Sequence, residues 1–118
     1  MSRHAYHLLI SRYDPAKFEG LHRDRFLEAL NAEGIPCARG YIPLYRTNAI
    51  ANSVRRLRAT TTGVDRPYEL PDCPVTERAC EEEGVWFTQT MLLGSKADAD
   101  DIAAAIRKIQ RRAGDLLD

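Results

Sequence analysis

Several features that commonly indicate a function are absent from the 118-residue sequence. No apolar run approaches the roughly 20 residues that a membrane-spanning helix needs. The first residues show no basic region followed by a long apolar stretch, so no secretory signal is expected. Seventeen basic and seventeen acidic residues cancel, so no overall field favours nucleic acid or an anionic membrane. We therefore expect a cytoplasmic protein with no membrane partner, and nucleic acid is not the expected ligand.

Cysteine is scarce, and the common catalytic signatures are missing. The three cysteines are odd in number and form no CxxC, so they indicate neither a disulfide framework nor a zinc site. No GxSxG, Walker loop or GxGxxG occurs. His4 and His7 form an HxxH, but residues three apart on a strand point to opposite faces and cannot share a metal. The residues alone thus indicate no catalytic group and no metal site.

What is present is an alternation of strand and helix patterns in a single domain of ordinary composition, 44% hydrophobic and 29% charged. The expected order is β-α-β-loop-α-β-α, a small two-layer α+β domain of about three mostly antiparallel strands with helices on one face. Strands are expected at residues 6–13, 37–42 and 85–92, and helices within 21–35, 72–84 and 98–116.

The expected helix ends rest on particular residues. Gly34 accepts the left-handed conformation that ends a helix, and Pro36 prevents its continuation. Pro74 suits a first helical turn capped by Asp72 or Cys73. Asp98 is the expected N-cap of the last helix. That helix repeats apolar residues in steps of four, three, four and three, at Ile102, Ile106, Ile109, Ala113 and Leu116.

Residues 46–69 lack a clear period and are rich in arginine. A long connection of this kind is unusual inside a compact domain, so we expect a functional loop, a segment that lies on another surface, or a mobile, disordered segment. A short helix around residues 50–57 is compatible with the sequence. The cluster Arg55, Arg56 and Arg58 could contact phosphate, because arginine binds phosphate in a bidentate manner. Three arginines in a chain of zero net charge are a weak signal for nucleic acid.

The run "GYIPLYR", residues 40–46, follows the second expected strand. Its tyrosines, with Arg39 just before it, are residue types that hold polar or anionic groups in binding sites. They are also ordinary residues of a strand end, so residue chemistry alone leaves both interpretations open.

Four segments together carry a family resemblance: "YHLLISRYDP", "RDRFLEALNAEGIPCARGYIPLYR", "LPDCPVTERA" and "VWFTQTMLLGSKADADDIAAAIRKI". In this order and spacing, over about residues 4–116, they resemble the C-terminal small domain of the DegT/DnrJ/EryC1/StrS aminotransferases. These are fold-type-I, pyridoxal-phosphate-dependent enzymes that act on sugars and cyclitols. The resemblance implies the same α+β fold for this chain.

The resemblance also implies that the cofactor belongs to a large N-terminal domain, which carries the Schiff-base lysine, the aspartate at the pyridine nitrogen and the phosphate-binding groups. That domain is outside these 118 residues, and none of Lys17, Lys96 and Lys108 matches the family's catalytic lysine. We therefore expect no cofactor-binding residue in this chain, pyridoxal phosphate in the full-length enzyme, and no activity from the chain alone.

For the opening run, the resemblance implies a position at the mouth of the active site. Many members carry a histidine where Tyr45 stands, and tyrosine does not titrate near neutral pH. We therefore interpret Tyr45 as a contact residue, not as a catalyst. Arg39 and Tyr41 are the expected neighbours for substrate or cofactor-phosphate groups, and packing against the large domain is the equal alternative for both tyrosines.

The sequence thus predicts the small domain of an aminotransferase that moves an amino group from glutamate or glutamine to a keto sugar or keto cyclitol. Its expected partner is the large domain, or another chain that carries it, with self-association through an exposed apolar face. Two alternatives stay open. One is a stand-alone, non-enzymatic interaction module, and the other is a small nucleic-acid-binding α+β domain that uses the arginine cluster.

Overall fold

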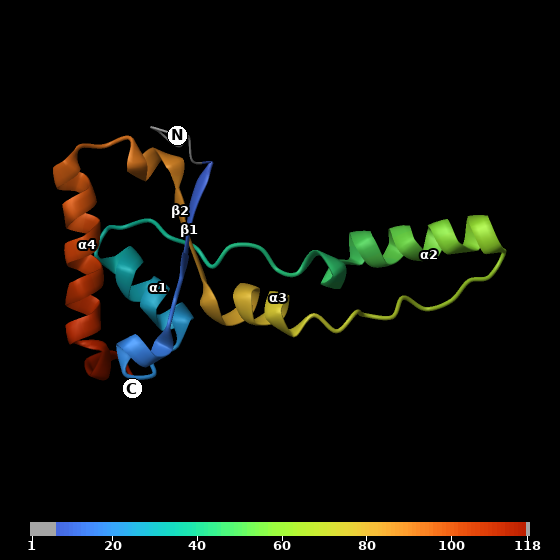
Figure 1. The fold of residues 1–118 in the computed structure, drawn as a ribbon, viewed down its shortest axis with the longest axis horizontal. Helices are drawn as coiled ribbons and strands as arrows, with labels where there is room; N and C mark the ends of the chain where they lie inside the picture. The colour runs from blue at the N-terminus through green and yellow to red at the C-terminus, as the bar shows by residue number, and fades with distance from the viewer. Residues whose placement is uncertain (1–6, 118) are drawn as a thin grey trace.

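The computed structural model describes residues 7–117 and divides them between a packed body and a long projection (Figure 1). The projection, residues 47–72, is called the arm below, and the remaining described residues are the body. The molecule measures 60 × 40 × 24 Å along its principal axes, because the arm extends away from the body. The helices and strands are β1 (Leu8–Arg12), α1 (Arg23–Ala32), α2 (Asn48–Thr62), α3 (Pro74–Arg78), β2 (Gly84–Thr88) and α4 (Lys96–Arg111).

The sheet of the body has two antiparallel strands, β1 and β2, in a register that places Ile10 opposite Trp86. The expected third strand at residues 37–42 is reduced to a single bridge, in which Ala38 exchanges both backbone hydrogen bonds with Trp86 at 3.0 and 2.8 Å. Gly40, at φ 82°, turns the chain out of the ladder two residues later. The prediction of about three strands is therefore wrong in this detail, while the α+β class is confirmed.

One face of the sheet forms the core. Val85 and Phe87 of β2 are buried, and α1 and α4 lie on the same side of the strands (Figure 1). At the lower end of the body the rings of Tyr13, Phe18 and Phe26 pack at centroid distances of 4.8–5.0 Å. The Tyr13 hydroxyl donates a 2.8 Å hydrogen bond to the Leu21 carbonyl, so the buried phenol keeps a partner.

Helix ends follow the local signals in most cases. The backbone of Ile35 bonds to the Leu30 carbonyl around Gly34, at φ 85°, which confirms the expected end of α1. Pro74 occupies the first turn of α3, which passes into a π-helical turn (Ala79–Glu83) and meets β2 at Gly84. The prediction of Asp98 as the N-cap of α4 is wrong. Ser95 is the cap, and Asp98 is the third helical residue of a capping box.

Strand β2 is shorter than the expected range of 85–92. It ends at Thr88, opposite the first residue of β1, and a 3₁₀ turn (Gln89–Leu92) follows.

The segment expected as a long loop at residues 46–69 is helical over most of its length. Helix α2 has 15 residues, which is longer than the expected 50–57. The Thr47 side chain accepts from the Ile50 amide at its start, and Gly63, at φ 70°, ends it. The chain then returns toward the body in extended form beneath the helix (Figure 1). The mobility of this segment stays a prediction.

Substitution of Leu30 tests the packing of the core. Its side chain is 0% exposed, so replacing it with alanine leaves a cavity between α1 and the sheet. We expect Leu30→Ala to lower the free energy of unfolding by about 2–5 kcal/mol in urea denaturation. Leu93→Ala removes the same atoms from a side chain that is 73% exposed and should change stability by less than about 0.5 kcal/mol. Equal effects of the two substitutions would contradict this description of the core.

Substitution of Gly40 tests whether the chain passes directly over the Trp86 ring of β2. A Cβ on Gly40 would lie 2.5 Å from the Trp86 ring, whereas one on Gly63 would meet nothing within 4 Å, although both residues have positive φ. Gly63→Ala therefore measures the backbone strain alone, about 1–2 kcal/mol. Gly40→Ala should cost about 1–3 kcal/mol more, because the indole must move. Trp86 is the sole tryptophan, so its fluorescence reports the displacement directly. If folded Gly40→Ala has the same tryptophan fluorescence spectrum as the original protein, the close approach of Gly40 to Trp86 is refuted.

Candidate functional site

The outer face of the sheet, opposite the core, carries a groove of about 520 Å³. Side chains alternate along a strand, so Ile10 and Trp86 point outward between their inward-facing neighbours. Ile10 is 60% exposed, although it sits in the middle of β1. The rest of the lining comes from residues 39–44, from Thr76 of α3, from the π-helical turn and from neighbouring residues of the two strands. Its other apolar members are Tyr41, Ile42, Pro43, Leu44, Ala79 and Cys80.

Arg39 and Tyr41, both predicted as site residues, lie at this groove. The Tyr41 ring meets the Trp86 ring edge to face, with centroids 4.5 Å apart and planes at 81°. The two rings form an aromatic surface beside the exposed Arg39 guanidinium. Such a surface can pack against the apolar side of a ring-shaped ligand while the guanidinium binds hydroxyl or anionic groups. The role of these residues in binding stays a prediction.

Tyr45, the third predicted site residue, points elsewhere. Its hydroxyl donates a 2.9 Å hydrogen bond to Glu77 Oε1 on α3, and it does not line the groove. Loss of solvent and this hydrogen bond raise the pKa of Tyr45 to about 12, so the phenol stays protonated near neutral pH. The structure therefore brings Arg39 and Tyr41 together and separates Tyr45 from them.

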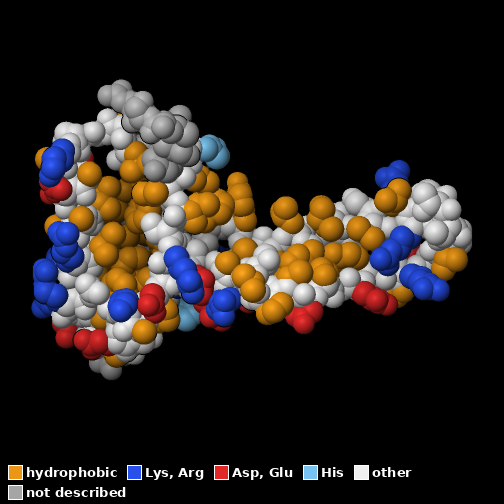
Figure 2. All heavy atoms as spheres, viewed as in Figure 1, with side chains coloured by type: hydrophobic (Ala, Val, Ile, Leu, Met, Phe, Trp, Pro, Cys, Tyr) orange, Lys and Arg blue, Asp and Glu red, His pale blue; other side chains and the backbone are white. Residues whose placement is uncertain are grey.

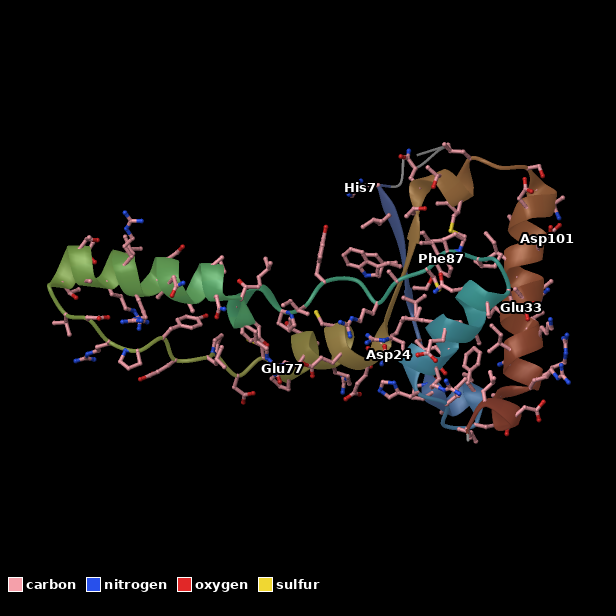
Figure 3. The ribbon with its side chains drawn as sticks, turned by 180° about the vertical axis from the view of Figure 1, so that it is seen from behind. His7, Asp24, Glu33, Glu77, Phe87 and Asp101 are labelled. Atoms are coloured by element: carbon pink, nitrogen blue, oxygen red, sulfur yellow. The ribbon has the colours of Figure 1, made fainter. Side chains whose placement is uncertain are left out.

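Arg46 completes a polar cluster with Tyr45. Its guanidinium contacts Glu77 at 2.9 Å and also pairs with Glu81 in the π-helical turn. Glu77 lies on α3 near the base of the arm (Figure 3). The hydrogen bond from Tyr45, followed by Arg46, lowers the pKa of Glu77. This cluster is called the clip below, because it fastens residues 45 and 46 to α3. The sequence reasoning missed Glu77 and Glu81, although their spacing of four places them on one helical face.

The lysines do not suit the pyridoxal phosphate that the resemblance implies for the whole enzyme. A Schiff-base lysine needs a desolvated amine of lowered pKa. Lys96 is 87% exposed and pairs with Asp100, and Lys108 pairs with Glu33. None of the three lysines lines the groove. In the described residues none of the three lysines is therefore placed as a Schiff-base lysine would be.

Other polar candidates have structural partners or lie apart. His22 accepts a hydrogen bond from the Asp24 amide at the start of α1, His7 is exposed, and His4 lies outside the described residues. Within residues 7–117 no group of three or more His, Cys, Asp or Glu is placed to hold a metal ion. In the same range, every helix is too short or too polar to cross a membrane.

The arginine cluster of the arm is partly committed to internal pairing. Arg55 forms a bidentate contact with Asp65, which joins α2 to the returning segment at 2.9 Å. Arg56 and Arg58 are exposed, and within residues 7–117 their guanidinium groups have no hydrogen bond or ion pair. These two arginines are therefore the members of the cluster that are available to a partner.

The clip generates a test of its own. Tyr45→Phe removes the hydrogen bond to the ionised carboxylate, so the pKa of Glu77 should rise toward its ordinary value, as measured by carboxyl NMR titration. A lowered native pKa stabilises the fold above the unfolded-state pKa, and that contribution is lost as the pH falls through the native value. Acidification should thus destabilise the variant less than the original protein.

Tyr68→Phe is the matched control, since no residue in the described range is hydrogen-bonded to the Tyr68 hydroxyl. It should leave the Glu77 titration unchanged. If Tyr45→Phe also leaves the pKa of Glu77 unchanged, the clip does not exist in solution.

Curated relatives match this chain over nearly all of its length. It is 34% identical over 122 residues to the proposed L-glutamine:3-amino-2,3-dideoxy-scyllo-inosose aminotransferase of Streptomyces kanamyceticus. The match covers 100% of this chain and 29% of that protein. It is 35% identical to the protein of the same name from Streptoalloteichus tenebrarius, over 94% of this chain and 28% of the relative. The L-glutamine:2-deoxy-scyllo-inosose aminotransferase of the same organism is 31% identical over 94% of this chain and 27% of its own length.

No family model matches the chain. The chain spans less than a third of the length of these relatives, and the matched portion is their C-terminal part. The α+β class that the resemblance implied is confirmed by the structure. The chain therefore belongs to the aminotransferases of the DegT/DnrJ/EryC1/StrS type and corresponds to their C-terminal part.

Proposed function

We propose that this chain acts as the small domain of a cytoplasmic, pyridoxal-phosphate-dependent aminotransferase that moves the amino group of glutamine or glutamate to a keto cyclitol or keto sugar. The observation that carries the proposal is the match over the whole chain to relatives named for L-glutamine and scyllo-inosose derivatives. When bound, the cofactor would supply the electron sink for the transfer. The residues that hold it would come from a large domain.

The groove gives the small domain a role in that enzyme. Its apolar lining is too exposed to be explained by the body alone, because Ile10 and Ile42 both face solvent. A large domain that covers this face would exclude water from it and bring Arg39 and Tyr41 to the substrate. Arg39 would then bind hydroxyl or phosphate groups, and Tyr41 would pack on the substrate ring. Tyr45 would act through the clip by holding residues 43–46 in place.

By itself the chain would be inactive, since its lysines are exposed and away from the groove. The large domain would be supplied by the same polypeptide or by another chain. A stand-alone interaction module is the second candidate, and the exposed apolar residues of both groove and arm favour it. In that case the groove would bind a protein surface and no amino transfer would occur.

A chimaera tests the proposal. This chain replaces the matching C-terminal part of the Streptomyces kanamyceticus relative, and glutamine-dependent amination of a scyllo-inosose ketone is measured. We expect activity, and we expect Arg39→Ala to lower kcat/KM about 10- to 100-fold through the loss of a charge-assisted hydrogen bond. Arg107→Ala, on the exposed face of α4, is the matched control and should leave kcat/KM unchanged.

The isolated chain provides the complementary measurement. Pyridoxal phosphate added to it should give no saturable aldimine absorbance beyond that of a Lys17→Arg/Lys96→Arg/Lys108→Arg variant. A saturable, lysine-dependent signal would refute the inactivity of the chain alone. A folded, cofactor-loaded chimaera without amination would favour the interaction module.

A further inference from the structure

Arg23, the first residue of α1, is a buried cation outside the groove and the clip. Among residues 7–117 it is the one charged residue that is buried, and it is 3% exposed. Its guanidinium donates to Asp24 Oδ1 at 2.9 and 3.0 Å and to the Cys80 carbonyl at 2.7 Å. A buried ion pair is weak evidence for stability, since apolar residues of similar volume often replace one without loss. A role other than stability therefore has to explain why a guanidinium lies here.

The Cys80 carbonyl belongs to the π-helical turn that joins α3 to β2. The last four carbonyls of a helical segment have no partner within it, and in this turn they are those of residues 80–83. Two of the four are bonded from the body. Cys80 accepts from Arg23, and Glu83 accepts from the Tyr13 amide at 2.7 Å. The turn is thus held near both of its ends.

The same turn forms one wall of the groove and receives the clip, at the junction of body and arm where hydrophobic side chains gather (Figure 2). Thr76, Cys80 and Glu83 recur at steps of four and three and line the groove. Glu81 is the residue of the turn that pairs with Arg46. A single π-helical turn is rare and occurs frequently at functional sites. The position of this turn therefore determines both the groove wall and the clip.

Gly84 connects the turn to Arg39, a predicted site residue. A Cβ on Gly84 would lie 2.9 Å from the Ala79 carbonyl oxygen and 3.3 Å from the Arg39 carbonyl oxygen. The φ of Gly84 is −70°, which any residue adopts, so glycine is needed here for the close approach of the backbone and not for its conformation. A displaced turn would therefore press on the backbone of Arg39 or withdraw from it.

We propose that Arg23 is a positioning residue for the candidate site, because its guanidinium fixes the π-helical turn and thereby the groove wall, the clip and Arg39. Without the guanidinium the Cys80 carbonyl loses its donor, and the turn is free to rotate about its remaining bond to Tyr13. An apolar side chain of the same size would fill the space but would not direct this carbonyl. The effect of Arg23 on substrate binding rests on the proposed function, whereas its effect on the turn does not.

Spectra of the 118-residue chain test the effect on the turn. Arg23→Met keeps an unbranched side chain and removes the donors. We expect it to shift the guanidinium NMR resonances of Arg46 and the fluorescence of Trp86, because Arg46 pairs with Glu81 and Trp86 lines the groove beside the turn. Arg23→Lys keeps one donor and should shift both signals less. Arg25→Met removes an exposed guanidinium from the same helix and is the matched control, which should leave both signals unchanged.

A second variant and a stability measurement separate position from stability. Gly84→Ala displaces the turn while Arg23 stays intact, so it should shift the same two signals. All spectra are recorded without denaturant on variants that circular dichroism shows to be folded. If Arg23→Met lowers the free energy of unfolding but leaves both signals of the folded chain unchanged, Arg23 serves stability alone and the proposal is overturned. If Arg23→Met does not fold, Arg23→Lys decides, and unchanged signals in that variant overturn the proposal in the same way.

The chimaera with the Streptomyces kanamyceticus relative measures the effect on substrate binding. A groove wall that contacts the substrate away from its reacting carbon contributes uniform binding, so Arg23→Met should raise KM about tenfold and change kcat less than about twofold. Arg25→Met should change neither constant. A KM that Arg23→Met leaves unchanged would overturn the role of Arg23 in the site. A chimaera that is inactive with the original sequence would instead refute the proposed function, and the spectra of the chain would still decide whether Arg23 holds the turn.

Discussion

The placement of Trp86 at the centre of β2 is the constraint on which both faces of the body depend. Its backbone bonds to Ala38 on one side, and β1 pairs with the strand on the other, so β2 cannot rotate. With the strand fixed, alternation sends Val85 and Phe87 into the core and the indole outward. Trp86 therefore supplies the floor of the groove because its two neighbours are buried.

A continuous series of contacts then leads from this strand to the arm. Gly40 lets the chain cross closely over the indole, Tyr41 packs its edge on the same ring, and Pro43 is buried. The clip follows at once and fixes the base of α2 to α3. The helical segment that receives the clip is itself held to the core, where the buried Arg23 donates a 2.7 Å hydrogen bond to the Cys80 carbonyl. The direction of the arm is thus set by the core.

Local signals in the sequence predicted what depends on one residue and its near neighbours. Gly34 ends α1 and Pro74 starts α3 as expected, because both effects are properties of the backbone of that residue. The N-cap of α4 was misplaced by three residues, since serine and aspartate in a capping box both suit the cap position. The prediction of a third strand was wrong because Gly40, at positive φ, turns the chain away from β2 after a single bridge at Ala38.

In the candidate site too, local sequence identified the residues, and only tertiary contacts distinguish their roles. The resemblance directed attention to Arg39, Tyr41 and Tyr45 together, and nothing local distinguishes the two tyrosines. Only the fold shows that Tyr41 meets Trp86 while Tyr45 meets Glu77, because each partner lies more than 30 positions along the chain.

Net charge illustrates why composition and placement lead to different conclusions. The balance of seventeen basic and seventeen acidic residues argues against a partner of one strong sign, such as nucleic acid. It does not show that the surface is uniform. The clip uses Arg46 to hold carboxylates at the base of the arm, and the free arginines Arg56 and Arg58 stand near its tip. Zero net charge is therefore compatible with separated charges, and composition alone does not describe the surface that a partner would meet.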